Sequence, residues 1–139
     1  MRQSSPGRSP GRKTQPTLRL GEEDELVRTF REYIGLEREL ENAKISAASR
    51  PDFNVFDAFR IFDVESKGWV SITDLRVGLN EIGIYCSMEE LELFFKRYDK
   101  VADRQLRFAE FCDAIAPIDQ YYANILNRRN SNNNRGRLY

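Results

Sequence analysis

Histidine is absent from this 139-residue sequence, and cysteine and tryptophan are scarce, with two residues and one. Without histidine, the chain lacks the side chain that most often acts as a general base or zinc ligand near neutral pH. The cysteines, Cys86 and Cys112, fit neither a disulfide framework nor a zinc site, so we expect reduced thiols. The chain also has no glycine-rich phosphate loop and no nucleophile beside a base. These absences predict a protein that is not an enzyme.

Long apolar runs are absent too. No run approaches the roughly 20 residues that a membrane-spanning helix needs. The basic N-terminal segment has no apolar stretch of the kind found in secretory signals. We therefore expect no membrane insertion, and a location in the cytoplasm or cytoskeleton.

The net charge of zero hides a segregation of charge along the chain. Residues 1–20 carry five basic residues and residues 128–139 carry four, with no acid in either segment. Residues 21–127 carry 13 basic and 22 acidic residues, a net charge of −9. Two basic arms suit an extended acidic partner surface, whereas their few aromatic residues argue against nucleic acid. We assign partner contact to basic residues of both arms: Arg8, Arg12, Lys13, Arg128 and Arg129.

The first arm, residues 1–20, is rich in Ser, Pro, Gly and Arg. Such a segment buries too little apolar area to offset the entropy of ordering, so we expect it to be disordered or extended. Ser5 and Ser9 each precede proline and could be phosphorylated, which would cancel local positive charge. A plain solvated tail is the alternative.

Residues 21–50 follow as a predicted long helix, regular from Glu22 to Ala48. Acidic residues crowd its start, where the helix dipole favours them. Its apolar residues recur at steps of three and four, and the stripe could form a coiled-coil seam, pack on the rest of the chain, or dock on another protein. We assign partner contact to four members of this stripe: Leu26, Phe30, Tyr33 and Leu40.

Two twelve-residue segments, residues 63–74 and 99–110, organise the rest of the chain. Apolar residues at helical spacing flank both, which predicts two helix–loop–helix units. A calcium loop takes oxygen ligands from positions 1, 3, 5, 7, 9 and 12, with glycine at position 6. Val70 and Leu106, at position 8 of each loop, are expected to pair. The candidate metal ligands are Asp63, Glu65, Ser71 and Asp74 in the first loop, and Asp99, Asp103 and Glu110 in the second.

Both loops depart from a good calcium loop. Lys67 places a cation at position 5 of the first loop, where it removes a ligand and repels a metal. The second loop has Val101 at position 3, Arg104 in place of the turn glycine and Arg107 at position 9. We therefore expect weak or empty sites, with loops retained for their shape, and we keep calcium as a possible cofactor.

The segment 51–118 containing both loops is followed by a predicted short helix, residues 119–127, and an Asn-rich basic tail, residues 128–139. Apolar residues of the short helix could close the core or fill a groove between the two units: Tyr121, Tyr122, Ile125 and Leu126.

Segment 51–118 resembles a paired EF-hand domain, and the fold class expected is therefore all-α. Three runs, PDFNVFDAFRIFD, IGIYCSMEELELFFKRYD and LRFAEFCDAIAPIDQYYANILNRR, are similar to EF-hand proteins associated with cilia and flagella. That resemblance spans residues 25–129 and implies a module beside axonemal microtubules, with tubulin or axonemal proteins as partners. The predicted function is thus a structural interaction module in a cilium or flagellum, and the alternative is a calcium sensor that switches a partner.

Overall fold

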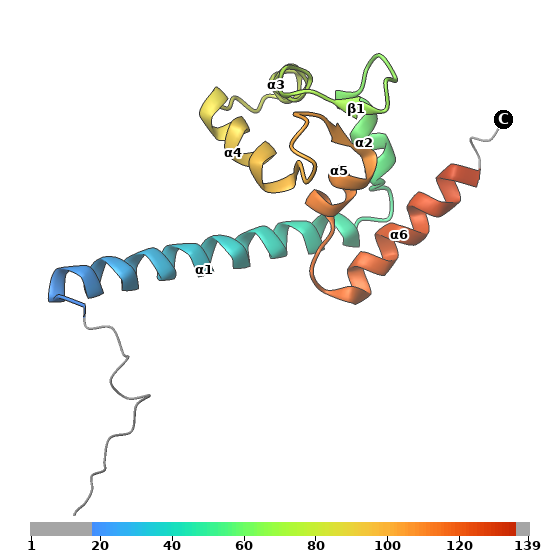
Figure 1. Ribbon diagram of the computed structural model, residues 1–139. Helices are drawn as coiled ribbons and strands as arrows, with labels where there is room; N and C mark the ends of the chain where they lie inside the picture. Colours follow the sequence, from blue (N-terminus) through green and yellow to red (C-terminus); the bar gives the residue numbers. More distant parts are fainter. Residues whose placement is uncertain (1–17, 136–139) are drawn as a thin grey trace, which may run out of the picture. The chain divides into compact units, whose positions relative to one another are not determined.

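The computed structural model describes residues 18–135 and confirms an all-α fold, in which two short strands are the only extended elements described (Figure 1). None of the described helices is both long and apolar enough to cross a bilayer. The described residues fall into two compact units, divided between Glu39 and Leu40. In order, the elements are α1 (Leu20–Ser49), α2 (Val55–Phe62), β1 (Trp69–Val70), α3 (Ile72–Glu81), α4 (Met88–Tyr98), β2 (Leu106–Arg107), α5 (Phe108–Ile115) and α6 (Gln120–Arg135).

Helix α1 agrees with the helix predicted from Glu22 to Ala48 and exceeds it slightly at both ends. At the start of the helix, the Glu22 carboxylate accepts a hydrogen bond from the backbone N–H of Arg19 at 3.0 Å. Glu22 and Glu23 lie in the first turn, where they complement the helix dipole. Residues 20–39 of this helix belong to the first unit, and its last turns belong to the second.

The two predicted helix–loop–helix units are present, as α2–β1–α3 and α4–β2–α5. Side-chain caps set three of the helix starts: Asn54 for α2, Ser71 for α3 and Ser87 for α4. Strands β1 and β2 pair antiparallel, with Val70 opposite Leu106 as expected. This bridge ties the two loops together, and both side chains are fully buried.

Phenylalanines of α2 and α5 form one part of the core of the second unit. Phe59 meets Phe108 and Phe111 edge to face, with ring centroids 5.5 and 5.4 Å apart. Phe56 and Phe62 flank this contact on α2. Edge-to-face contacts add to the burial of such rings. The helix that enters the first loop and the helix that leaves the second are thereby held against each other.

Two glycines are needed for the packing of α3. At Gly78 a Cβ would lie 2.4 Å from Cδ1 of Phe62, so α2 and α3 approach as closely as they do only because this residue has no side chain. Gly83 has φ +87° and ends the helix. The N–H of Ile84 donates to Leu79 O and that of Gly83 to Asn80 O, the pair of bonds that closes a Schellman motif.

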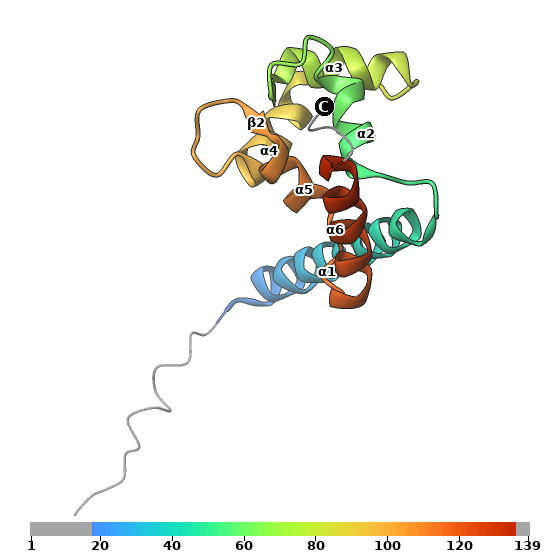
Figure 2. The same ribbon diagram turned by 90° about the vertical axis from the view of Figure 1, so that its right-hand side faces the viewer.

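Helix α6 differs from the prediction of a short helix over residues 119–127, because it continues to Arg135. It begins beside the last turns of α1, where Glu41 accepts the N–H groups of Ile118 and Asp119 at 2.8 and 2.9 Å (Figures 1 and 2). Farther along, Arg129 donates to the carbonyl of Phe53 at 2.9 Å. These tertiary bonds, together with buried Ala123 and Leu126, extend a helix whose Asn-rich end has low intrinsic helix propensity.

Candidate functional site

The first loop is held in shape by the carboxylate of Asp63, at position 1. It accepts the backbone N–H groups of Lys67 and Gly68, each at 2.8 Å, and the side chain is buried. At the other end, Asp74 accepts the N–H of Ser71 at 3.0 Å, while the Ser71 hydroxyl accepts the N–H of Asp74. The last loop residue thus doubles as part of the cap of α3.

Lys67 reaches across this loop. Its ammonium lies 2.8 Å from Oδ2 of Asp74 and 3.7 Å from Oε1 of Glu65, so it bridges positions 12 and 3. It also lies over the ring of Trp69, 4.3 Å from the ring centroid, within the range of a cation–π contact. A cation supplied by the chain therefore contacts two of the carboxylates that a calcium ion would need.

The protonation behaviour of this pair follows from the same contact. The hydrogen bond to Asp74 raises the pKa of Lys67, against the opposing effect of burial. For Asp74, burial acts to raise the pKa, but hydrogen bonds from Lys67 and Ser71 outweigh it, and the pKa is lowered. At neutral pH the two side chains are thus an ammonium and a carboxylate.

The second loop repeats the backbone arrangement of the first. Asp99, at position 1, accepts the N–H groups of Asp103 and Arg104 at 3.4 and 2.6 Å. At position 12, both oxygens of the buried Glu110 accept backbone N–H groups, from Lys100 at 2.8 Å and from Arg107 at 3.0 Å. The residue that would chelate calcium with two oxygens instead joins the start of the loop to its end.

The basic side chains of the second loop form ion pairs with acids rather than lying between its carboxylates. Arg104 pairs with Glu92 of α4 at 2.7 Å and lowers the pKa of that carboxyl. Arg107 pairs with Asp103 at 2.5 Å and lowers its pKa too. The position-5 ligand candidate, Asp103, is thereby engaged with a guanidinium.

Both loops also share a backbone twist at positions 4 and 6. Ser66 and Ala102 have φ of 55° and 54°, and Gly68 and Arg104 have φ of 89° and 61°. Glycine adopts this region without strain, but Arg104 does so at a cost of about 1 kcal/mol or more. The second loop therefore keeps the turn of a calcium loop although the glycine is missing.

A family model described as "EF-hand domain pair" matches residues 52–116, which contain both loops, the β-bridge and helices α2 to α5. Residues 52–116 thus have the fold of a paired EF-hand domain. The matched range lies within the predicted pair, residues 51–118.

A 61-residue segment of the chain is also similar to calcium-binding protein 7 from rat (Rattus norvegicus), human (Homo sapiens) and mouse (Mus musculus). In each case the identity is 31% over 61 residues, which is 44% of this chain. The match spans only 28% of the length of those relatives. The similarity thus concerns one segment that the proteins share.

Several of the candidate calcium ligands already contact other groups of the chain. Among the described residues, no three acidic or cysteine side chains gather closely enough to hold a metal ion. The Lys67 ammonium bridges Glu65 and Asp74 in the first loop, and backbone amides take both Glu110 oxygens in the second. Calcium needs six to eight oxygen ligands, so binding would first require these internal bonds to break.

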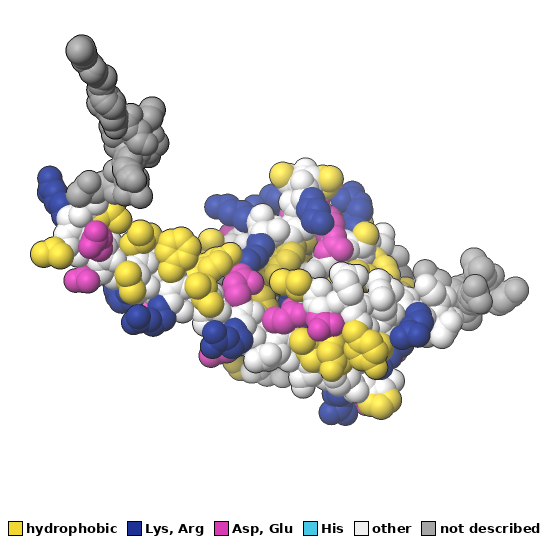
Figure 3. All heavy atoms as spheres, turned by 90° about the horizontal axis from the view of Figure 1, so that it is seen from below, with side chains coloured by type: hydrophobic (Ala, Val, Ile, Leu, Met, Phe, Trp, Pro, Cys, Tyr) yellow, Lys and Arg dark blue, Asp and Glu magenta, His cyan; other side chains and the backbone are white. Residues whose placement is uncertain are grey.

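The residues predicted for partner contact fall into three groups. Arg8, Arg12 and Lys13 lie outside the described residues, as do Ser5 and Ser9. Leu26, Phe30 and Tyr33 are exposed along α1, where Figure 3 shows hydrophobic side chains gathered on one face. Leu40 belongs to the second unit and lines an apolar groove with Phe94 and Tyr98, so the predicted stripe is divided between the two units.

The two C-terminal arginines have different environments. Arg128 is exposed, whereas Arg129 is half-buried and bonded to Phe53. Arg129 thus holds α6 against the segment before α2, and its contact with a partner stays a prediction, as does that of Arg128. The sequence analysis placed both arginines in a tail that begins at residue 128. It therefore missed that α6 continues to Arg135 and turns the two neighbouring side chains to different sides.

Proposed function

We propose that this chain is a non-catalytic interaction module whose EF-hand pair is held in shape by its own side chains. One observation carries the proposal: the Lys67 ammonium contacts the carboxylates of Glu65 and Asp74 in the first loop. The ammonium is part of the chain, so unlike a free ion it is present at every calcium concentration. The two carboxylates of this loop are therefore bonded whether or not calcium is present. Such a module contributes shape to an assembly rather than a response to calcium.

The chemistry of the Cys112 thiol supports a role without catalysis. Burial first, and then the negative charge of Asp113, raises the pKa of Cys112 to about 11. A thiol with that pKa is protonated at neutral pH and is a poor nucleophile. The sequence offers no histidine that could activate it.

The assembly that we propose is the axoneme of a cilium or flagellum, with tubulin or axonemal proteins as neighbours. The resemblance of residues 25–129 to cilium-associated EF-hand proteins supports this location. The charge pattern supports it as well, since basic termini on an acidic body suit an extended acidic lattice. Exposed Leu26, Phe30 and Tyr33 of α1 would contact a neighbouring protein.

A calcium titration of the full chain tests the proposal. Trp69 is the only tryptophan and contacts the Lys67 ammonium, so its fluorescence reports on the first loop. We expect no change in fluorescence and no heat in calorimetry up to about 100 µM calcium, the range of sensor and weaker regulatory sites. A saturable isotherm at micromolar calcium that Asp63→Ala or Glu110→Ala abolishes would refute the proposal.

The second candidate function is a calcium sensor that switches a partner. The similarity to calcium-binding protein 7 favours it, because that protein's name states calcium binding. The acids retained at positions 1 and 12 of both loops favour it too. A sensor would require a calcium-dependent change in partner binding, whereas the structural module binds equally with calcium and with chelator.

The location has its own test. Crosslinking in native axonemes should join α1 to a neighbouring protein. A Phe30→Ser chain should lose that crosslink, while its circular dichroism spectrum shows that the EF-hand pair is still folded.

The N-terminal arm is tested separately. Removing residues 1–17 should weaken assembly binding more at low than at high salt, because screening already removes charge contacts at high salt. Equal binding by the shortened chain would rule out the N-terminal arm.

A further inference from the structure

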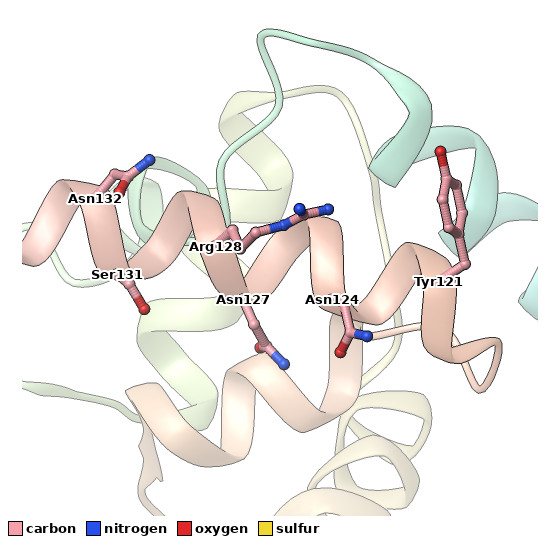
Figure 4. A pocket seen from close by; sticks show the side chains of 6 residues that line it. All are labelled: Tyr121, Asn124, Asn127, Arg128, Ser131 and Asn132. Carbon is pink, nitrogen blue, oxygen red and sulfur yellow. The ribbon is translucent and has the colours of Figure 1, made fainter.

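Helix α6 carries a polar outer face that the EF-hand pair does not use. Ala123 and Leu126 turn inward and are buried. The exposed side chains are polar and lie at helical spacing, where they surround a shallow depression of about 560 Å³ (Figure 4). We call this surface the outer face of α6; it consists of Tyr121, Asn124, Asn127, Arg128, Ser131 and Asn132.

The outer face is positive and contains no acid. From Gln120 to Arg135 the helix has three arginines and no aspartate or glutamate. Arg129 is committed to the carbonyl of Phe53, on the inner side. Arg128 has no ion pair with any residue of the described range 18–135, in contrast to Arg104 and Arg107, which pair with acids in the second loop. Its guanidinium is therefore available to an external carboxylate.

The geometry of the face suits an extended chain. Figure 4 shows Tyr121, Arg128 and Asn132 on one side of the helix and Asn124, Asn127 and Ser131 on the other. The face is about 16 Å long, since a helix rises 1.5 Å per residue. That length matches about five residues of an extended peptide. Each Asn amide both donates and accepts, so it can bond the backbone groups of such a peptide.

We infer that the outer face of α6 binds an extended, Glu- or Asp-rich segment of a partner protein. Arg128 holds a carboxylate through two parallel N–H donors, and the amides hold the peptide backbone. This inference rests on the proposed interaction role and names a partner class for it. An amphipathic helix fits the face less well, because Tyr121 is its only large apolar side chain. Nucleic acid fits less well too, since phosphate binding draws on several cations and base stacking on several aromatics.

The test uses the full chain and a fluorescein-labelled ten-residue peptide of alternating Glu and Gly, followed by fluorescence anisotropy at low salt. Arg128→Glu should weaken binding at least fivefold, because it replaces the carboxylate's partner with a like charge. Arg76→Glu is the matched control: Arg76 is exposed on α3, and the substitution changes net charge equally. We expect it to weaken binding less than twofold. A peptide with Gln in place of Glu should bind at least fivefold more weakly.

Amide NMR shifts supply a second measurement. Adding the Glu peptide should shift the signals of residues 121–132 and leave those of α3 unchanged. Equal losses for Arg128→Glu and Arg76→Glu, absence of peptide binding, or binding of a thymidine oligonucleotide in place of the peptide would each overturn the inference. These results leave the proposed function untouched, since it fails through a calcium isotherm, which is measured separately.

Discussion

The two loops of the EF-hand pair keep the same backbone by different means. In each, the aspartate at position 1 accepts the N–H groups of positions 5 and 6, and the acid at position 12 accepts that of position 9. In the first loop a lysine ammonium bridges the carboxylates of positions 3 and 12. In the second, the backbone N–H of Lys100 takes the remaining oxygen of Glu110. The acid at position 12 is thus bonded to a side-chain ammonium in the first loop and to a second main-chain N–H in the second loop.

This difference separates the shape of an EF-hand loop from its affinity for metal. The turn survives Arg104 at position 6, with φ of 61°, because Asp99 and the β-bridge fix the backbone on both sides. Affinity depends on side chains that point inward, and these differ between the two loops. The first loop has a side chain without an oxygen at one ligand position, Lys67 at position 5, whereas the second has two, Val101 at position 3 and Arg107 at position 9, and also lacks the turn glycine at position 6.

The largest effect should come from the bridge that the loops share. Leu106→Ala removes a fully buried side chain opposite Val70, and we expect unfolding free energy to fall by about 2–5 kcal/mol. Because both loops contact through this pair, they should unfold in one transition. Urea titration followed by Trp69 fluorescence and by far-UV circular dichroism measures this. Val101→Ala, at an exposed loop position, is the control with little expected effect. Two separate transitions would show that the loops are independent.

The fold was predictable because its main determinants are patterns in the sequence. The loop spacing and the apolar helix faces are such patterns, and the shared register of the two loops also predicted the contact between Val70 and Leu106. The defects of the loops could be read from single positions in the same register. Other contacts between distant residues were not visible, such as the Glu41 cap of α6, which joins residues 77 and 78 positions apart.

The candidate site was predictable in its residues but not in its bonds. Lys67 was expected to repel a metal, and the structure adds that its flexible side chain turns back onto Asp74 and Trp69. Rotamers of this kind depend on neighbours that the sequence does not place. The continuation of α6 beyond residue 127 was missed because asparagine is a weak helix former, and the bond from Arg129 to Phe53 is tertiary.

A second change should break the first hand and spare the second. Gly78→Ala places a Cβ against the Phe62 ring, and we expect a loss of about 1–3 kcal/mol from overpacking between α2 and α3. Amide hydrogen exchange should quicken in α2 and α3 more than in α4 and α5. Gly35→Ala in α1 is the matched control, because nothing lies within 4 Å of its Cβ position. It should leave exchange in the EF-hand pair unchanged. Equal acceleration of all four helices would mean that the hands open together.

A third change tests how far each loop is from binding calcium. Lys67→Asp removes the internal cation and supplies a ligand at position 5, so we expect calcium affinity to rise at least tenfold, or about 1.4 kcal/mol. Val101→Asp adds one ligand at position 3 of the second loop, but Arg107 still holds Asp103 and backbone amides still hold Glu110. We expect a change below threefold. Titration calorimetry with calcium measures the affinity of both variants. An equal gain in affinity for the two would contradict the statement that the first loop is nearer to a complete set of ligands than the second.

The smallest expected effect is on the stability of the fold at low pH, and it concerns the Lys67–Asp74 bond of the first loop. The pKa of Asp74 is lowered in the folded chain because bonds from Lys67 and Ser71 outweigh burial. A carboxyl with a lowered folded pKa stabilises the fold above its unfolded pKa of about 3.9, and this stability is lost as pH falls through the folded pKa. In Lys67→Met, only the hydrogen bonds with Ser71 still oppose the rise in the pKa of Asp74 that burial causes. Asp74 should therefore become protonated at a higher pH, and stability should begin to fall at a higher pH than in the unchanged chain. Urea titrations between pH 7 and pH 3 measure the shift. Lys96→Met, which removes an exposed lysine of α4, should leave the acid profile of the first hand unchanged; the same shift in both variants would assign the effect to net charge instead of to the Lys67–Asp74 bond.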